Sequence, residues 1–157
     1  MRGWQPLRLL WFALALIDPP CKDPGMVSIP EQVHSWLDGQ EFAVLATVMP
    51  NGQPHQSVVW VAREGDDVLV STVKGRRKHQ NLVNDPRCSL LVYPRDNPYS
   101  YVEIRGRADV TEVGGRELID RLCQHYTGKS RYTADDGTDN IRVVVRISVD
   151  KVVTLIR

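Results

Sequence analysis

The chain has 157 residues, the length of one domain, which is enough to bury a hydrophobic core. Hydrophobic residues make up 42% and charged residues 25%, values that are ordinary for a globular protein. The formal net charge is +1, which argues against general coating of a nucleic acid, so any anion site must come from a local cluster of cations.

The first 25 residues differ from the rest of the chain. The apolar run Leu9 to Ile17 is too short to span a bilayer, and neither an A-x-A cleavage site nor a lipobox follows it. Three interpretations stay open: a mis-assigned start with Met26 as the first residue, a disordered extension, and a signal or anchor. We expect residues 1–25 to be an extension, residues 26–157 to form the domain, and the protein to be cytoplasmic.

Cysteines and histidines show no pattern that is typical of a metal site or a disulfide framework. The three cysteines are widely spaced and odd in number, and the four histidines are scattered. Cys88 and Cys123 fall in apolar strand and helix patterns, so we expect them to be small buried hydrophobic residues. The sequence predicts no metal site.

A short amphipathic helix is expected at the start of the domain. Ser28 to Glu31 fits a capping box with a proline in the first turn. Apolar residues follow at helical spacing, and Gly39 ends the run.

An antiparallel meander is expected next. Its strands are predicted at Glu41–Val48, Pro54–Ala62 and Asp67–Val73. Asn51-Gly52 is a hairpin signal between the first two strands, and a second turn at residues 63–66 makes the last two strands hairpin partners.

A basic turn follows the third strand. Lys74, Arg76, Arg77 and Lys78 lie between this strand and a short helix predicted at about Arg76–Val83, with no acidic residue nearby. Such a turn brings backbone N–H groups, hydroxyls and fixed cations together, which suits a phosphate or another polyanion. The alternative is a solvated basic turn without a ligand.

The second half of the chain adds more strands, a helix and a loop. We predict strands at Arg87–Tyr93, Ser100–Val113, Ile141–Val149 and Lys151–Ile156, a helix at Arg116–Thr127, and a mobile loop at Gly128–Asp139. Gly106 in the long strand indicates a bulge or a close backbone approach. Six to seven antiparallel strands with inserted helices predict an all-β or α+β fold, a small closed or split β-barrel.

The residues favour a site on the strands, where Gln56-Ser57 and Ser71-Thr72 would lie side by side on hairpin partners. No nucleophile elbow, dinucleotide-binding glycine motif, P-loop or paired-carboxylate pattern is present, so hydrolysis and nucleoside-triphosphate chemistry lose support. The basic turn would bind a phosphate, and a flat ring could lie against the backbone of Val58 to Trp60. Trp60 could equally belong to the core, and Tyr99 and Tyr101 could be aromatic groups near the sheet end or a packed surface loop.

Several short motifs occur in a fixed order along the chain. They are Val44-Leu-Ala-Thr, Asn51-Gly-x-Pro-His55, Val70-Ser-Thr, Arg76-Arg-Lys-x-x-Asn-Leu82, Asp85-Pro-Arg-x-Ser-Leu and Tyr101-Val-Glu-Ile-Arg-Gly-Arg-Ala. The ordered set resembles the pyridoxamine 5'-phosphate oxidase-like split-barrel flavoproteins over roughly residues 27–155. It is most similar to the branch of deazaflavin (coenzyme F420)-dependent oxidoreductases.

The resemblance implies an oxidoreductase that uses reduced coenzyme F420 to transfer a hydride to an unsaturated small molecule. The alternatives are an FMN-binding oxidoreductase of the same fold and a non-catalytic carrier of F420 or another anionic ring compound. The resemblance also implies a homodimer with cofactors at the subunit interface, without nucleic-acid or membrane partners. A nucleic-acid binder is disfavoured by the net charge near zero.

The resemblance assigns cofactor-binding roles to residues of this chain. The phosphate and tail contacts would be Arg76, Arg77, Lys78, Asn81, Ser71 and Thr72, the ring contacts Gln56, Ser57, Val58 and Val59, and the contact to a partner's cofactor Tyr101. The substrate-binding C-terminal Arg-x-His pattern of pyridoxamine oxidase is not found, so oxidation of pyridoxamine phosphate is not expected. No catalytic residue is assigned, although Tyr101 or His55 could donate a proton.

Overall fold

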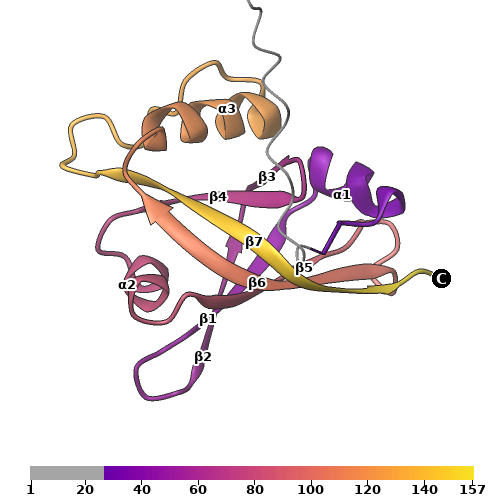
Figure 1. Ribbon diagram of the computed structural model, residues 1–157. Helices are drawn as coiled ribbons and strands as arrows, with labels where there is room; N and C mark the ends of the chain where they lie inside the picture. The colour runs from indigo at the N-terminus through magenta and orange to yellow at the C-terminus, as the bar shows by residue number, and fades with distance from the viewer. Residues whose placement is uncertain (1–26) are drawn as a thin grey trace, which may run out of the picture.

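The computed structural model describes residues 27–157, so the interpretations of the N-terminal extension lie outside the described residues. This part of the chain forms one antiparallel sheet with a few short helices (Figure 1). The elements are η1 (Glu31–Val33), α1 (His34–Asp38), β1 (Ala43–Val48), β2 (Pro54–Val59), β3 (Val61–Glu64), β4 (Asp67–Val73), α2 (Arg77–Asn84), β5 (Arg87–Val92), β6 (Tyr101–Thr111), α3 (Gly115–Thr127) and β7 (Arg142–Leu155). Within these residues no helix is both long enough and apolar enough to cross a membrane.

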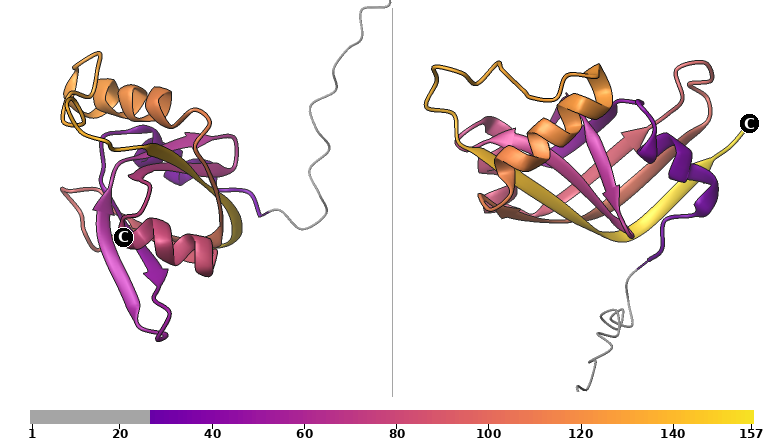
Figure 2. Two further views of the ribbon diagram at one scale, coloured as in Figure 1. Left: turned by 90° about the vertical axis from the view of Figure 1, so that its left-hand side faces the viewer. Right: turned by 90° about the horizontal axis from the view of Figure 1, so that it is seen from above.

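The sheet curls into a split barrel, which confirms the predicted fold class. Its strand order is β2-β1-β5-β6-β7-β4-β3, so the two edge strands are consecutive in the chain. They meet at Trp60, where a single stretch of backbone joins the two edges of the sheet. The left view of Figure 2 shows the strands curving around the barrel interior, with α3 above the ring of strands and α2 across its lower side.

The bend at Trp60 corrects one prediction. The sequence pattern makes Gln56 and Ser57 neighbours of Ser71 and Thr72 across a hairpin. In the structure only the β3 part of the predicted strand Pro54–Ala62 pairs with β4. Ser57 of β2 lies opposite Leu45 of β1, and Ser71 of β4 lies opposite Val144 of β7. The hairpin is short because the chain crosses from one edge of the sheet to the other at Trp60.

The two longest strands, β6 and β7, pair along most of their length at the centre of the sheet. The register of this pair shifts at Gly106, because Arg105 pairs with Lys151 while Gly106 pairs with Val149, and Asp150 is the extra residue. A Cβ at Gly106 would lie 2.2 Å from the Ser148 carbonyl oxygen, so only glycine fits. The predicted bulge is confirmed, and the two predicted C-terminal strands are one strand, β7.

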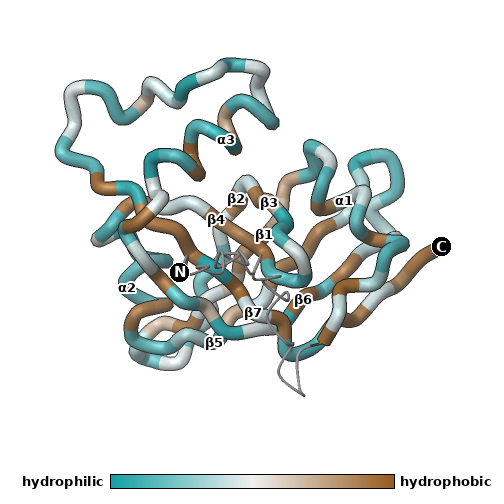
Figure 3. The backbone as a smooth tube through the Cα atoms, turned by 45° about the horizontal axis from the view of Figure 1, so that its top comes forward, coloured by the Kyte–Doolittle hydropathy of each residue, from teal (hydrophilic) through white to brown (hydrophobic). Residues whose placement is uncertain are grey.

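Two apolar clusters hold the fold together. The main cluster fills the barrel, with Leu45, Leu90 and Ile104 fully buried. A smaller cluster lies outside the barrel, where Leu118 and Leu122 of α3 pack on the outer face of β4 and β7. Figure 3 shows hydrophobic stretches along the strands and a largely hydrophilic loop after α3. The second cluster places α3 over the sheet and leaves room for a cavity beside it.

Two local predictions need comment. The N-terminal helix begins with a short 3-10 turn whose N-cap is Pro30, so Ser28 is not the N-cap residue that the predicted capping box requires. The segment expected to be a mobile loop, residues 128–139, is a loop without helix or strand, and side chains hold parts of it in place. Arg131 pairs with Asp136 at 2.6 Å, and the Tyr132 amide donates to the Asp120 carboxylate at 2.7 Å.

Candidate functional site

A cavity of about 200 Å³ lies between α3 and the outer face of β4 and β7. Its lining combines apolar and aromatic side chains with three cations and contains no carboxylate. The lining residues are Phe42, Val58, Val59, Trp60, Ser71, Arg76, Lys78, Ile119, Leu122, Tyr132 and Arg142. A mostly apolar cavity with a few converging charges suits an anionic ligand with a flat apolar body.

The start of α2 forms one corner of this cavity, which we call the α2 corner (Arg76 and Lys78). The chain turns at Gly75, which has a φ of 86°, and the Gly75 amide donates to His79 Nδ1 at 3.2 Å. The first turn of α2 has neither an acidic residue nor a side-chain cap. The first amides of α2, which lack intrahelical partners, therefore occur in the same turn as two cations, a combination found in many anion sites.

The other two basic residues of the turn lie outside the cavity lining. Lys74 Nζ forms an ion pair of 2.5 Å with Glu112, and both side chains are about half exposed. Arg77 is exposed on α2. Of the run 74–78 that was expected to close the site, Arg76 and Lys78 line the cavity, and Lys74 and Arg77 do not.

Lys78 reports the electrostatics of the cavity. Burial lowers the pKa of its ammonium group, and the nearby guanidinium groups of Arg76 and Arg142 lower it further. Lys78 thus lies near two other cations, and no carboxylate is among the lining residues. A bound anion would relieve this repulsion.

Aromatic rings form the wall opposite the α2 corner. Trp60 is half-buried and stacks on Tyr126, with ring centroids 5.2 Å apart and an interplanar angle of 10°. Tyr132 meets Trp60 edge-on at 6.2 Å, and Phe42 stacks on Tyr126 at 5.7 Å. The Tyr126 hydroxyl donates to the Glu41 carbonyl oxygen at 2.8 Å, which fixes the stack against the sheet.

Most of the described chain matches the model of one protein family. The model described as pyridoxamine 5'-phosphate oxidase matches residues 29–155. The chain belongs to the pyridoxamine 5'-phosphate oxidase family. This confirms the resemblance that the ordered motifs indicate.

Solved structures of similar proteins agree with this assignment. One described as an F420 reductase is 26% identical, covers 80% of this chain and 98% of its own, and has a TM-score of 0.71. A conserved hypothetical protein from Mycobacterium tuberculosis is also 26% identical, with coverages of 84% and 87% and a TM-score of 0.63. General Stress Protein 26 from Bacillus anthracis, at 19% identity, coverages of 80% and 92% and a TM-score of 0.60, shows the shared fold.

The cavity of this family member brings together five of the eleven residues predicted to bind a cofactor. They are Val58, Val59, Ser71, Arg76 and Lys78. The Ser71 hydroxyl is buried without a hydrogen-bond partner among the described residues. An unpaired buried hydroxyl is costly, so its place beside the cations fits a ligand that accepts or donates a hydrogen bond there.

Thr72 and Asn81 lie elsewhere, with side chains that are almost completely buried. The Asn81 amide donates to Thr47 Oγ1 at 2.9 Å, so it joins α2 to β1. Thr72 neighbours Ser71 on β4, and successive side chains of a strand point to opposite faces. These two residues therefore face away from the cavity.

The remaining predicted residues do not line the cavity. Gln56 is exposed on β2, and the Ser57 hydroxyl is buried without a partner among the described residues. Tyr101 pairs with Leu155, at the far end of β7 from Arg142 and about 40 Å along that strand. Within one chain Tyr101 cannot reach the cavity, and its contact to a partner's cofactor stays a prediction. His55 also lies outside the lining.

Sequence reasoning missed Tyr132 in the aromatic wall and Arg142 among the cations. Tyr132 and Arg142 line the cavity, yet they lie in a segment interpreted as a loop and at the start of a strand. The available indication was an arginine at the start of an apolar strand, which can be buried only if a carboxylate neutralises it. Asp135, seven residues earlier, is that carboxylate, with Oδ2 2.6 Å from Arg142 Nε.

A larger cavity of about 640 Å³ lies near the β1–β2 hairpin and the bulge between β6 and β7. Its cations are neutralised, because Arg105 pairs with Glu103 at 2.8 Å and Arg87 pairs with Asp85 at 2.6 Å. Cys88 also lines it, and burial, with a smaller effect of Asp150, raises the pKa of that thiol to about 12, so the thiol is not a ready nucleophile. The larger volume favours this cavity as a ligand site, but the unpaired cations and aromatic lining favour the cavity under α3.

Proposed function

We propose that the chain is an oxidoreductase that binds reduced coenzyme F420 in the cavity under α3 and reduces an unsaturated small molecule. The observation that carries this proposal is a pair of cations without a carboxylate partner, Arg76 and Lys78, which share the cavity lining with aromatic residues and with Arg142, which is paired with Asp135. The similarity to an F420 reductase at 26% identity favours a deazaflavin over other anionic ring compounds.

The lining residues fit such a cofactor. Arg76 and Lys78 would hold its phosphate, and the unpaired Ser71 hydroxyl would bond to its polar chain. The ring would lie along Val58 to Trp60, where apolar residues of α3 exclude water. When bound, reduced F420 supplies a hydride, so the acceptor gains that hydride and a proton from water.

We further propose that the site is completed by a second copy of the chain. A volume of about 200 Å³ is below the range of about 300–1,000 Å³ that is usual for ligand sites. Val58 at the cavity is 66% exposed, and Leu91, which shares its sheet face through Val44, is 36% exposed. A homodimer that covers this face would enclose the cofactor and bring Tyr101 of the second copy near it.

Cofactor titration tests the first proposal. Purified protein is titrated with F420 and with FMN while ligand fluorescence is followed. We expect micromolar binding of F420 and weak binding of FMN. A yellow protein that carries FMN would replace F420 with a flavin, and binding of neither would overturn the cofactor assignment.

Turnover separates an enzyme from a carrier. Reduced F420 is mixed with the protein and a panel of quinones, enones and tetrapyrroles, and its oxidation is followed by absorbance. We expect oxidation with at least one class of acceptor. Tight F420 binding without any oxidation would mean a non-catalytic carrier.

Sedimentation velocity tests the dimer. We expect the wild-type protein to sediment with twice the mass of one chain and the Leu91→Glu variant to sediment as a monomer. The matched control is Val113→Glu, because Val113 is 83% exposed and lies outside this face. A monomeric wild-type protein, or an unchanged Leu91→Glu variant, would contradict the proposed interface.

A further inference from the structure

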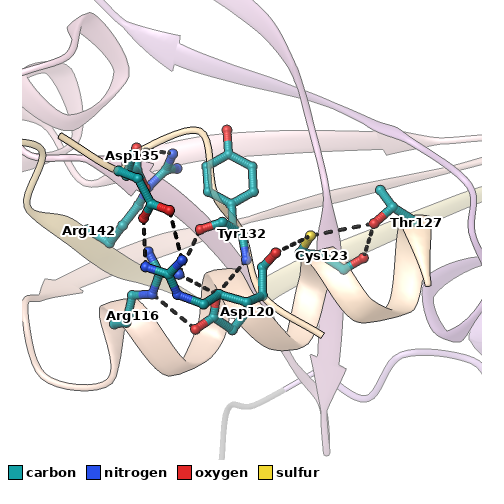
Figure 4. Close-up of polar contacts among 9 residues, drawn as sticks. Arg116, Asp120, Cys123, Thr127, Tyr132, Asp135 and Arg142 are labelled. Carbon is teal, nitrogen blue, oxygen red and sulfur yellow. Dashed lines mark hydrogen bonds and ion pairs between the residues drawn. The ribbon is translucent and has the colours of Figure 1, made fainter. Parts of the chain in front are cut away.

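Arg142 reaches the cavity through a buried ion pair with Asp135. Arg142 Nε donates to Asp135 Oδ2 at 2.6 Å and Nη2 donates to Oδ1 at 2.9 Å, which makes the contact bidentate (Figure 4). Both side chains are only 7% exposed. Arg142 belongs to the cavity lining, whereas Asp135 does not. The pair thus lies at the edge of the site, with Arg142, its positive member, as part of the lining.

Asp135 is itself fixed from two further sides. Asn140 Nδ2 donates to its Oδ1 at 2.9 Å, and the Thr138 hydroxyl donates to its carbonyl oxygen at 2.7 Å. The ring of Tyr132 lies under the Arg142 guanidinium, 4.7 Å from its centre. The guanidinium is therefore held in its plane by the carboxylate and from one face by the ring.

The helix α3 supports this arrangement through its first turns. Arg116 pairs with Asp120 at 2.8 Å and also donates to the Tyr132 carbonyl oxygen at 2.7 Å. Asp120 in turn accepts the Tyr132 amide at 2.7 Å (Figure 4). The backbone at Tyr132 is thus bound on both sides to α3, which fixes the ring that Arg142 lies on.

A buried ion pair is weak evidence for stability alone, because desolvation offsets most of the attraction and apolar residues often stabilise as well. A role of Asp135 in orienting Arg142 explains the burial of this pair better than a contribution to stability does. Asp135 accepts from Nε and Nη2, so Nη1 with its two N–H groups is not bound to that carboxylate. Lys78 across the cavity has its pKa lowered in part by Arg142, so the two cations act on the same space.

We propose that Asp135 is a positioning residue that fixes Arg142 as the third cation of the site, where Arg142 binds the anionic tail of the cofactor. The ligand class is an organic phosphate with a negatively charged tail and a planar ring. This inference rests on the proposed function for the identity of the cofactor, but not for the location of the charges.

The experiment compares charged and uncharged forms of one ring. Wild-type and variant proteins are titrated with F420 and with FO, which carries the same deazaflavin ring and ribityl chain without phosphate or carboxylates. The main variant is Asp135→Asn/Arg142→Gln, which removes both charges and leaves no unpaired buried ion. Its matched control is Arg131→Gln/Asp136→Asn, an exposed pair of 2.6 Å on the same segment.

We expect the Asp135→Asn/Arg142→Gln variant to bind F420 about tenfold more weakly and FO equally well, since a charge-assisted contact is lost. Asp135→Asn alone keeps the cation but loosens it, so its F420 affinity should fall by about threefold, an intermediate loss. The control pair should stay within about twofold of wild type, as expected for an exposed pair. An unchanged ratio of F420 to FO affinity in the folded main variant would overturn the proposal.

A measurement on the wild-type protein covers the case in which the main variant does not fold. The Nε–H resonance of Arg142 is followed by NMR during titration with F420 and with FO. We expect a shift with F420 alone, and no shift with F420 would overturn the proposal. If the wild-type protein binds FMN and not F420, the F420 assignment fails, and the pair FMN and riboflavin replaces F420 and FO in the same comparison.

Discussion

The two corners of the cavity hold their cations in opposite ways. At the α2 corner, Arg76 and Lys78 make no ion pair with any described residue, and the cations repel one another. At the other corner, which we call the Asp135 corner (Tyr132, Asp135 and Arg142), the guanidinium is neutralised and fixed before any ligand arrives. The first corner therefore gains most from binding an anion, and the second supplies a defined geometry.

The two corners also differ in what they contribute to folding. At the α2 corner the unpaired cations repel one another, so removal of one should not destabilise the free protein. At the Asp135 corner removal of one partner leaves a buried charge without compensation, which destabilises the protein. Substitutions at the α2 corner should thus change ligand affinity with little loss of stability. Substitutions at the Asp135 corner should change both.

The largest effect is expected for Asp135→Ala. It leaves the Arg142 guanidinium, whose side chain is 7% exposed, without its partner. We expect the free energy of unfolding to fall by about 3–5 kcal/mol, as for other buried pairs that lose one member. Urea denaturation followed by circular dichroism measures it.

The control for this prediction is Asp136→Ala, which breaks the exposed pair with Arg131. Its cost should be about 0–1 kcal/mol. Equal losses in the two variants would mean that the Asp135 pair is no more structural than a surface pair.

The next effect concerns how closely α3 approaches β7. A Cβ at Gly115 would lie 2.1 Å from the Arg142 carbonyl oxygen, so Gly115→Ala must push the helix away from the Asp135 corner. We expect a loss of about 1–3 kcal/mol in unfolding free energy from this overpacking, together with weaker F420 binding. Thermal unfolding and F420 titration measure the two quantities.

Gly75→Ala is the matched change at the α2 corner. Gly75 has a φ of 86°, and a Cβ added there would meet no atom within 4 Å, so alanine strains the backbone without a clash. The expected cost is about 1–2 kcal/mol. A Gly115→Ala variant that is as stable as wild type would show that α3 can move without affecting Arg142.

Ligand affinity should separate Arg76 and Lys78 from their neighbour Arg77. We expect Arg76→Ala and Lys78→Ala each to weaken F420 binding by about 1–3 kcal/mol, because charge-assisted contacts to phosphate are lost. Arg77→Ala should leave affinity nearly unchanged, since its side chain is exposed outside the cavity lining. Isothermal titration measures all three, and equal losses would indicate a diffuse basic field in place of a defined corner.

The α2 corner can be predicted from the sequence because its parts are close together in the chain. One continuous segment contains the strand β4, the turn at Gly75, the two cations and α2, and it shows a clear pattern of hydrophobic and charged residues. The split barrel follows from alternating strands with short turns, and the bulge follows from Gly106 in a long strand. Local pattern was enough in each case.

The Asp135 corner could not be predicted in this way, because only tertiary contacts bring its residues together. Asp135 and Tyr132 lie in a polar segment that has no periodicity, and their partners are α3 and the start of β7. The crossing at Trp60 was missed for the same reason. An unbroken β pattern does not show where a strand leaves one edge of a sheet for the other.

The smallest effect, and the sharpest contrast between the corners, is expected for Lys78→Met. Burial, then Arg76 and Arg142, lower the pKa of Lys78 in the folded protein below its unfolded value. Between those two pKa values the unfolded chain binds more protons, so wild-type stability rises with pH there. Methionine keeps the apolar stem without the charge, so the variant should be slightly more stable than wild type at pH 7.

That advantage should shrink as the pH rises and Lys78 loses its proton in the wild-type protein. Urea denaturation at several pH values from 7 to above the unfolded pKa of the lysine measures it. Added F420 should reverse the order at pH 7, because the anion stabilises only the protein that keeps its cation. A variant that is less stable than wild type at every pH, with or without F420, would mean that Lys78 contributes to packing and does not bind the anion.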